Sequence, residues 1–581
     1  MTIRPLHLEA YQKLIRVSLR KEPACIWFKN VDFLNVYTGK VERKNISISG
    51  ERIAYVGEKE PFISDDTKVI ELDQDQIIVP GYVEPHGHPF QLYHPITWSD
   101  FLLSGGTTTS INDNMPIFQP LGLDKSIKFI EELDVKSNLI HLWWARFDGQ
   151  IDTVKNDKAF SMDSLGKWLH HPFVIQGGEF TSWSQFLKGD STLSQLMHMA
   201  RHQYDKRIEG HLPGASIETL NAMAAGGISA DHESITGEDV LNRTSIGMHA
   251  ALRHSSIRPD LPTILKDFEK MSPLHLSLLM LTSDGSHPYF LHNTGMDKMI
   301  EIVLEYGFNE IDAYRMATLN PVKYYGLDQD IGSITPGRLA NLNVLEKLSK
   351  PTPIHVMVGG KWVKHNHTLL NESKSSDYNW LKNYFNNERK NLTITEADLS
   401  IDEGTTGVKL INDVISLPYS YKPTGPLSEN ELYMSLLDRD GKWIINTRIK
   451  HFSSDLAGLA TSYNASGDYV LIGNDKKKMI QALQQVIALN GGIVASFANG
   501  DEITISLPIN GTMSMLPLKE LIKQSNDFVG KMKHSGYRFE DPFFTLFFLN
   551  STHLPNIRLT SDGIYLIKEE KIITPVVKLE R

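Results

Sequence analysis

The sequence predicts an α/β protein: a (β/α)8 TIM-like barrel with a small flanking β-sandwich domain and a C-terminal α+β domain. Eight short apolar segments alternate with helix-like stretches between residues 78 and 284, which favours a parallel sheet. Eight such units within about 250 residues are typical of a barrel. The chain has 581 residues, room for three or four domains at about 150 residues each, and 41% of them are hydrophobic, so large cores can form.

The first 80 residues predict two elements before the barrel. Residues 1–25 are expected to form a helical lead-in, because Leu8, Tyr11 and Ile15 lie near helical spacing. From residue 26 to 80, apolar and polar residues alternate on both sides of Gly50, which is typical of a β-hairpin. Residues 331–366 alternate in the same way, so we expect them to return to this small β domain.

The barrel is expected at residues 81–330. Each candidate strand is a short apolar segment that ends in polar residues, as barrel strands do at the rim. The eight strands are predicted at Ile78–Glu84, Thr107–Asp113, Leu139–Ala145, Phe173–Gln176, Arg207–His211, Gly227–His232, Gly247–Leu252 and Leu276–Asp284.

Beyond the barrel, residues 367–400 are polar and predicted to be a linker with loose helical character. Residues 401–581 are expected to form a separate α+β domain. Its clearest strands are Tyr469–Ile472 and Ile503–Leu507, and its clearest helix is Lys477–Leu489.

Composition excludes several classes of function. The net charge is −10 (59 basic and 69 acidic residues), so a nucleic-acid polymer is not the expected partner. A single cysteine, Cys25, excludes a disulfide framework and any cysteine-based zinc site, so a metal would be held by histidines and carboxylates. No apolar run approaches the ~20 residues of a membrane span, and no signal peptide is visible, so a cytoplasmic protein is expected.

The strongest local signal is the pair His86-Gly87-His88 behind Val79-Pro80-Gly81. Residues at i and i+2 of an extended segment project to the same side, so both imidazoles can reach one cation. The segment follows the first candidate strand, where a barrel has its catalytic rim. Two unrelated loop histidines are the alternative, but this context favours a metal site.

Four further residues stand at the ends of later candidate strands: Glu179, His211, His232 and Asp284. Each by itself is more often an ordinary loop residue. Together with the histidine pair they form a set of imidazoles and carboxylates at one rim, which suits Zn²⁺, Mn²⁺ or Fe²⁺.

The chain resembles the adenine deaminase family of the metal-dependent amidohydrolase superfamily, as a divergent member. The resemblance runs through nearly the whole chain and is specific because the matching stretches occur in order. They are Val79–His88, Gly105–Thr109, Gly210–Gly214, Asp231–Glu233, Met316–Pro321, Ile334–Gly337, Leu507–Gly511 and Asp541–Phe544.

The resemblance implies a binuclear centre of two divalent ions, with Mn²⁺ or Fe²⁺ expected and Zn²⁺ as the alternative. His86, His88 and Asp284 would bind one ion, His211 and His232 the other, and Glu179 would bridge them. Glu233 directly follows a ligand and is expected to be a proton shuttle, or else to orient His232. The relatives also suggest a dimer or larger homo-oligomer.

The implied reaction is the hydrolysis of adenine to hypoxanthine and ammonia, with a small-molecule purine as partner. An activated water would attack C6 of the ring. Asp284 would accept the proton of this water, and Glu233 would protonate the ring nitrogen and the leaving amine.

Four stretches depart from the family pattern. Met115-Pro116 follow Asp113-Asn114 where the family shows Pro-His-Glu after the aspartate, and Tyr463–Asp468 replaces an Ala-His-Asp-Ser-His segment. Pro89–Leu92 also differs, and Gly285 stands where a second aspartate is common. Intact ligands with a changed surrounding shell predict retained hydrolysis with altered substrate choice.

Three alternatives follow from these departures. The first is an N6-substituted adenine, such as N6-methyladenine, as substrate. The second is cleavage of a cyclic amide, and the third is a purine-binding relative without activity. Asp113 is a candidate substrate-binding residue. Trp143 and Trp144 could stack a base, although at least one is expected to pack in the barrel because alternate strand residues face opposite sides.

Overall fold

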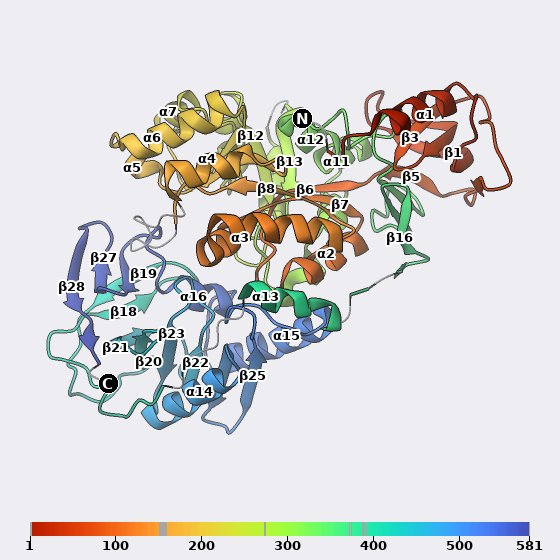
Figure 1. Ribbon diagram of the computed structural model, residues 1–581. Coiled ribbons are helices and arrows are strands. Elements are labelled where there is room, and N and C mark those ends of the chain that lie inside the picture. Colours follow the sequence, from red (N-terminus) through yellow and green to blue (C-terminus); the bar gives the residue numbers. More distant parts are fainter. Residues whose placement is uncertain are drawn as a thin grey trace.

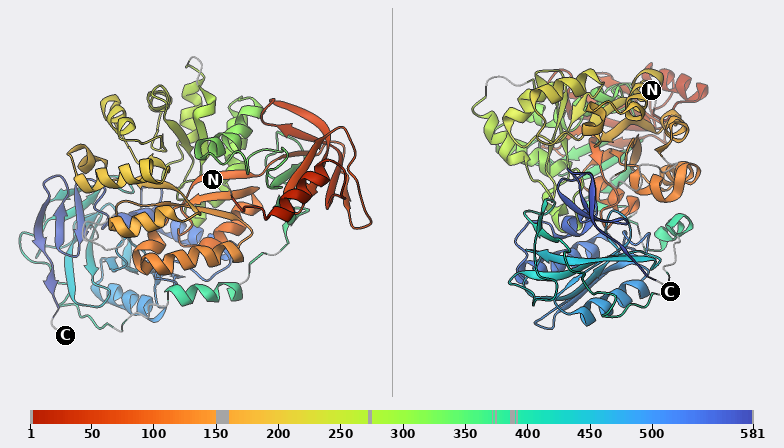
Figure 2. Two further views of the ribbon diagram at one scale, coloured as in Figure 1. Left: turned by 45° about the horizontal axis from the view of Figure 1, so that its top comes forward. Right: turned by 90° about the vertical axis from the view of Figure 1, so that its left-hand side faces the viewer.

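The computed structural model describes residues 3–149, 160–271, 275–370, 372–373, 375–385, 390 and 392–579. Three bodies are visible in Figure 1: a β domain, a barrel, and a C-terminal domain below the barrel. The side view in Figure 2 shows the barrel and the C-terminal domain as two stacked bodies. In the described part of the chain, no helix is both long and apolar enough to cross a membrane.

The β domain combines strands from both sides of the barrel in one nine-stranded sheet. Apolar residues of β2 (Lys40–Ser49), β3 (Arg52–Gly57), β14 (Leu342–Leu345) and β15 (His355–Val358) meet in a single core, so the sheet folds over on itself as in a sandwich. Its strands are β1 (Ile26–Asn35), β2 (Lys40–Ser49), β3 (Arg52–Gly57), β4 (Lys68–Ile70), β5 (Ile77–Pro80), β14 (Leu342–Leu345), β15 (His355–Val358), β16 (Lys361–His365) and β17 (Thr368–Leu369).

The N-terminal residues contain one helix, α1 (Leu8–Ser18). Its apolar spacing does not mark a buried face: Leu8, Tyr11 and Ile15 are exposed, and Val17 is the residue that packs inward.

Eight parallel strands form the barrel sheet in the order β13 to β6, which confirms the predicted fold class. An isolated parallel bridge between Gly87 and Asp284 joins its two ends. The strands are β6 (Tyr82–Gly87), β7 (Thr107–Asn112), β8 (Ile140–Ala145), β9 (Val174–Phe180), β10 (Arg207–Gly210), β11 (Ala230–Asp231), β12 (His249–Arg253) and β13 (Leu279–Thr282).

One predicted strand was wrong in an instructive way. The segment predicted as one strand, Ile78–Glu84, is divided at Gly81 between two sheets. β5 pairs with β1 and β14 in the β domain, whereas β6 pairs with β7 in the barrel. Continuous apolar sequence could not reveal this change of sheet, because both strands are buried on both faces.

Helices cover the outside of the barrel in Figure 1. They are α2 (Pro95–Ser104), α3 (Met115–Lys136), α4 (Met162–His170), α5 (Trp183–Leu187), α6 (Ser191–His198), α7 (Ile217–Ala225), α8 (Gly237–Thr244), α9 (Leu261–Phe268), α10 (Met296–Glu305), α11 (Glu310–Met316) and α12 (Leu319–Tyr325). Part of the predicted linker packs against α3 through α13 (Lys382–Phe385), where Phe385 contacts Phe129.

As far as residue 579, the C-terminal domain shows a second nine-stranded sheet, a three-stranded sheet and three α-helices. The large sheet contains β18 (Gly407–Leu410), β19 (Ser416–Tyr419), β20 (Glu431–Leu437), β21 (Trp443–Lys450), β22 (Leu456–Thr461), β23 (Tyr469–Gly473), β24 (Gly492–Phe497), β25 (Glu502–Ser506) and β29 (Val577–Lys578). The remaining elements are β26 (Ile557–Thr560), β27 (Gly563–Leu566), β28 (Lys571–Pro575), α14 (Lys476–Ala488), α15 (Leu518–His534) and α16 (Pro542–Phe548).

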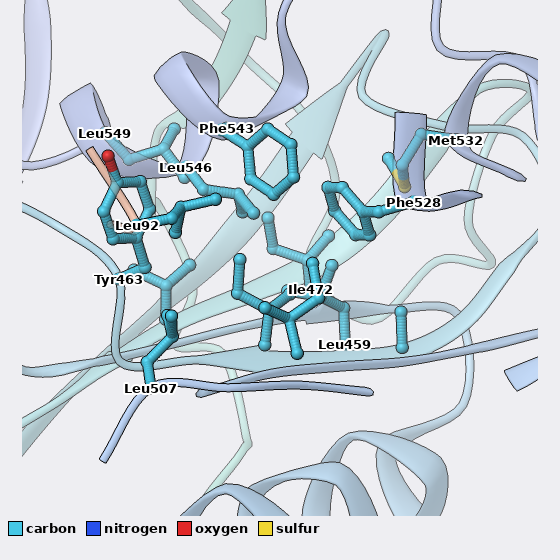
Figure 3. Close-up of a cluster of buried hydrophobic side chains, with 14 of the residues drawn as sticks. Leu92, Leu459, Tyr463, Ile472, Leu507, Phe528, Met532, Phe543, Leu546 and Leu549 are labelled. Atoms are coloured by element: carbon cyan, nitrogen blue, oxygen red, sulfur yellow. The ribbon is translucent and has the colours of Figure 1, made fainter. Parts of the chain in front are cut away.

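The barrel and the C-terminal domain share a hydrophobic core. Leu92, from the loop after β6, lies among Tyr463, Leu507 and Leu546 of the C-terminal domain (Figure 3). This loop also hydrogen-bonds through its backbone, because the amide of Ser514 donates to the carbonyl of Leu92 over 2.8 Å. The loop that follows the histidine pair is therefore fixed by the second domain.

Candidate active site

The six predicted ligands lie together at the carboxyl end of the barrel strands. His86 and Glu179 lie within β6 and β9, and the others lie one or two residues beyond their strands: His88, His211, His232 and Asp284. Asp284 has a positive φ of 48°, a left-handed conformation that aspartate adopts more readily than most residues. The strand ends thus bring together residues separated by up to 198 positions in the sequence.

One half of the cluster consists of His86, His88 and Asp284. The Nε2 atoms of the two histidines lie 3.1 Å apart, and Oδ1 of Asp284 lies 3.6 Å from the first and 3.1 Å from the second. Two imidazole nitrogens at this distance repel each other unless a proton or a cation satisfies their lone pairs. Burial lowers the pKa of His88, but the neighbouring Asp113 and Asp284 carboxylates outweigh this effect and raise it to about 10.

The other half consists of His211 and His232. Nδ1 of His211 lies 2.7 Å from Oε1 of Glu179 and 3.3 Å from Nε2 of His232. Burial lowers the pKa of His211, but the Glu233 and Glu179 carboxylates raise it to about 9. Both halves therefore attract positive charge.

Glu179 lies between the two halves. Its Oε2 is 3.9 Å from Nε2 of His86, and its Oε1 is 3.6 Å from Nε2 of His232. Two groups of three possible ligands share this carboxylate: His86, His88 and Glu179, and Glu179, His211 and His232. Imidazole and carboxylate donors with this convergence fit divalent transition-metal ions.

Glu209 is a site residue that the sequence analysis missed. Its Oε1 lies 2.9 Å from Nδ1 of His86 and 3.1 Å from Nδ1 of His232, so one carboxylate orients a histidine in each half. Gln176 donates to its Oε2 over 2.9 Å. Burial raises the pKa of Glu209, but the two histidines lower it to about 2, so the carboxylate is ionised.

A signal for Glu209 was present in the sequence. It stands two positions before His211 on a strand, and residues at this spacing face the same side. A carboxylate on the buried side of a barrel strand needs a polar partner, which the neighbouring histidines supply.

Asp113 pairs with both a ligand and a buried arginine. Its Oδ2 lies 3.3 Å from Nδ1 of His88, and Arg146 donates to its two oxygens over 3.1 Å each. Arg146 also donates to Oε2 of Glu179 over 2.7 Å. Burial raises the pKa of Asp113, but Arg146 and His88 hold it well below its usual range. Arg146, which the sequence analysis did not identify, thus fixes two carboxylates of the site.

Glu233 faces the cluster and two further arginines. Arg253 donates to its Oε1 over 2.6 Å and Arg258 donates to its Oε2 over 2.8 Å. The same Nη1 of Arg253 donates to Oδ2 of Asp284 over 3.1 Å. Burial raises the pKa of Glu233, but Arg253 and His211 hold it well below its usual range. The carboxylate is therefore ionised, and it orients His232 less directly than Glu209 does.

The cluster opens into a cavity of about 830 Å³ that the barrel and the C-terminal domain form together. His553 of the C-terminal domain lies on its wall, with its ring centre 6.3 Å from that of His211, and burial lowers its pKa to about 3. The other walls from this domain are formed by Asn412, Val414, Ile415, Arg439, Asn464–Gly467, Asn510, Thr512, Phe544, Phe547, Phe548, Leu554 and Pro555.

The four departures from the family pattern meet in this cavity. Each contributes to the lining, through Met115 and Pro116, through Phe90 and Gln91, through Gly285, and through Asn464–Gly467. Positions far apart in the sequence therefore surround the same space beside the cluster.

Neither tryptophan of the predicted pair lines the cavity. Trp143 and Trp144 are fully buried, and the ring of Trp144 packs 4.7 Å from that of His86. His141 is held by Ser99 and Asn112, consistent with a structural role.

Two family models match this chain, and solved structures are similar to it. The model of the Amidohydrolase family matches residues 77–363, and that of the Adenine deaminase C-terminal domain matches residues 417–571. A solved β-aspartyl dipeptidase from Fervidobacterium islandicum is 14% identical, with 61% of this chain and 99% of that chain covered at a TM-score of 0.46.

Curated relatives are similar over nearly the whole chain. A protein of Halalkalibacterium halodurans, provisionally named an adenine deaminase, is 40% identical, with 97% of each chain covered. A Picrophilus torridus protein with the same provisional name is 38% identical, with 99% of this chain and 96% of its own covered. The adenine deaminase of Kosmotoga olearia is 27% identical, with 95% and 96% covered. The chain therefore belongs to the adenine deaminase family of amidohydrolases, as its motifs predicted.

Proposed function

We propose that this protein hydrolyses adenine to hypoxanthine and ammonia. Family membership and the convergence of four imidazoles and two carboxylates at one cavity support this reaction. In the reaction, a bond forms between C6 and the oxygen of water, the bond from C6 to N6 breaks, and the protons of water pass to the purine and the leaving amine.

Membership of the amidohydrolase family implies a divalent metal, and the cluster supplies candidate ligands. We propose two ions, one held by His86, His88 and Asp284 and the other by His211 and His232, with Glu179 shared between them. Mn²⁺ or Fe²⁺ is the expected metal and Zn²⁺ the alternative. Bound divalent ions supply an activated water and stabilise developing negative charge.

Asp284 and Glu233 are the proposed proton carriers. Both are ionised, and both accept a hydrogen bond from the same nitrogen of Arg253. The two carboxylates therefore lie next to each other beside the cluster. Asp284 would accept a proton from the attacking water. Glu233 must first gain the proton that it delivers, since Arg253 and Arg258 favour its ionised form. It would take up one proton of the water and pass it to the ring nitrogen. It would then take up the proton held by Asp284 and pass it to the leaving amino group, which departs as ammonia.

The test is a panel of purines with the protein loaded in turn with Mn²⁺, Fe²⁺ and Zn²⁺, and with ammonia and hypoxanthine measured together. We expect stoichiometric release of both from adenine. Metal binding without turnover on any purine would instead favour a purine-binding relative without activity.

A second candidate substrate is an N6-substituted adenine. A cavity of about 830 Å³ lies in the upper part of the range of about 300–1,000 Å³ that accommodates drug-sized ligands, and a bare base would leave much of it empty. Met115, Pro116 and Phe548 give the cavity apolar surface for an alkyl group. Release of methylamine from N6-methyladenine faster than ammonia from adenine would decide for this substrate.

The predicted cytoplasmic location and homo-oligomer remain predictions. The oligomer can be measured by light scattering on the metal-loaded protein.

A further inference from the structure

A chain of hydrogen bonds connects the cavity to the interior of the C-terminal domain, and it begins at Gln91. Tyr463, in the loop after β22, donates its hydroxyl to Oε1 of Gln91 over 2.7 Å. The Tyr463 oxygen lies 2.8 Å from Nε2 of His287, and Nδ1 of His287 lies 2.8 Å from Oδ2 of Asp541. Tyr463, His287 and Asp541 are fully buried, whereas Gln91 lines the cavity.

The direction of the chain follows from the chemistry of its groups. A carboxylate only accepts, so His287 donates from Nδ1 to Asp541. Tyr463 has one hydrogen, which it gives to Gln91, so its oxygen accepts from Nε2 of His287. The amide oxygen of Gln91 therefore accepts from Tyr463, and this places its Nε2 amino group on the side of Gly285.

The far end of the chain is fixed in the C-terminal domain. Asp541 caps α16, since its Oδ1 accepts from the backbone amides of Phe543 and Phe544 over 2.9 and 3.2 Å. Its own amide donates to Asp413 over 2.6 Å. A buried network with every member satisfied is rigid, so the orientation of Gln91 is set by groups remote from the cavity.

The amino group of Gln91 lies beside the proposed reaction centre. A Cβ atom built on Gly285 would be 2.9 Å from Nε2 of Gln91 and 3.6 Å from Cβ of His88. The amide therefore occupies the space next to Asp284 that a side chain at position 285 would need. Among the residues that the structure describes, none accepts a hydrogen bond from this nitrogen.

We propose that Gln91 is a substrate-binding residue that donates a hydrogen bond from Nε2 to a ring nitrogen of the purine, and that Tyr463, His287 and Asp541 are positioning residues that hold its amide in this orientation. This inference rests on the proposed function, because it assumes a purine in the cavity. In this arrangement the C-terminal domain takes part in substrate selection, because the hydroxyl of its Tyr463 orients the amide that contacts the purine.

The test compares Gln91→Met, Tyr463→Phe and the control Tyr384→Phe in the metal-loaded full chain. Gln91→Met keeps the length of the side chain and removes the donor. Tyr384→Phe removes a tyrosine hydroxyl outside this network, which donates to Oε2 of Glu132 over 2.8 Å. Losing one neutral hydrogen bond should lower kcat/KM for adenine about three- to tenfold in Gln91→Met, mainly through KM. Tyr463→Phe should give a smaller loss of the same kind, and Tyr384→Phe none.

Inhibition constants of 1-, 3- and 7-deazaadenine identify the acceptor, because each analogue lacks one ring nitrogen. We expect wild type and Gln91→Met to bind the analogue that lacks the acceptor nitrogen with equal affinity. The other two analogues should bind more weakly to Gln91→Met than to wild type. A loss of equal size on all three analogues, or no loss on adenine, would overturn the inference. Metal content and circular dichroism establish that each variant is folded and loaded. Absence of adenine turnover in the wild type would refute the proposed function itself, a result distinct from unchanged kinetics in Gln91→Met.

Discussion

The barrel wall of the cavity carries charged side chains at strand ends, whereas the wall from the C-terminal domain carries aromatic rings and mostly neutral polar groups. On the barrel side, Glu179, Asp284 and Glu233 are each held by an arginine. On the other side, Phe544 and Phe548 stack at 5.4 Å and the neutral imidazole of His553 meets Phe548 edge-on.

The difference separates two tasks. Charged groups that strands and buried arginines hold in place can bind ions and transfer protons, because the surrounding structure fixes their positions and their charges. Aromatic rings and uncharged polar groups recognise the faces and edges of a flat base. The contrast predicts that substitutions of the charged residues at the barrel strand ends lower kcat or metal binding, whereas substitutions on the opposite wall change KM.

The largest effect is expected for Asp284→Asn. The variant keeps the shape of the side chain and loses the proposed proton acceptor, so kcat should fall by about 10²–10⁴-fold. Asp113→Asn is the matched variant, because Asp113 contacts Nδ1 of the same His88 whose Nε2 faces Asp284. Its loss should be smaller. Equal losses in the two variants, at equal metal content, would contradict a special role for Asp284.

The next effect concerns Glu209, which touches ligands in both halves. Glu209→Gln replaces an ionised acceptor with a neutral amide, so His86 and His232 lose part of their orientation. Metal affinity should fall about 10–100-fold, as for other carboxylates behind histidine ligands. Titration with a competing chelator measures it. Gln176→Glu is unsuitable as a control because it would place two carboxylates together. Gln176→Met removes the donor to Glu209 and the acceptor for the Tyr325 hydroxyl but leaves the Glu209 carboxylate in place, so it should lower the affinity less.

The two walls also differ in how far the sequence could predict their residues. Ligands such as His211 and Asp284 stand at strand ends, and strand ends can be located from short apolar segments. Glu209 follows from strand alternation once β10 is known. Arg146 and Arg253 also stand at the ends of strands, but nothing local distinguishes a buried arginine from an exposed one until its carboxylate partners are placed.

The C-terminal wall was beyond prediction for a different reason. The sequence predicted an α+β domain and some of its elements, but not where that domain docks. Docking depends on long-range contacts, such as Leu92 inserted among Tyr463 and Leu507, that leave no periodic signal. Only the structure shows that the departures at Gln91, Gly285 and Tyr463 are neighbours in space.

A smaller effect tests the aromatic wall. Phe548→Leu removes ring area at the cavity while Phe544 remains to cover the core. Losing one aromatic contact of about 0.5–1.5 kcal/mol corresponds to a two- to tenfold rise in KM for adenine, with kcat and metal content unchanged. If an N6-alkyl group lies against this wall, the rise should be greater for N6-methyladenine. A fall in kcat without a change in KM would argue against a division between the two walls.

The smallest effect is a dependence of stability on pH that distinguishes the walls in the metal-free chain. The pKa values of His88 and His211 are raised to about 10 and 9, against about 6.5 for histidine in an unfolded chain. A raised pKa in the folded state contributes stability that is complete below pH about 6.5 and is lost as the pH rises through 9 and 10. The chelated protein should therefore melt at progressively lower temperature between pH 6.5 and 10, by about 1 °C for each kcal/mol lost in a chain of 581 residues. Bound ions take the place of these protons and should remove most of this dependence of melting temperature on pH, because metal binding displaces protons from its ligands.

Calorimetry with and without chelator measures the melting temperature against pH for the metal-free and the metal-loaded chain. Since the neutral His553 on the opposite wall has its pKa lowered to about 3, His553→Gln should leave the slope unchanged, whereas His88→Gln should reduce it.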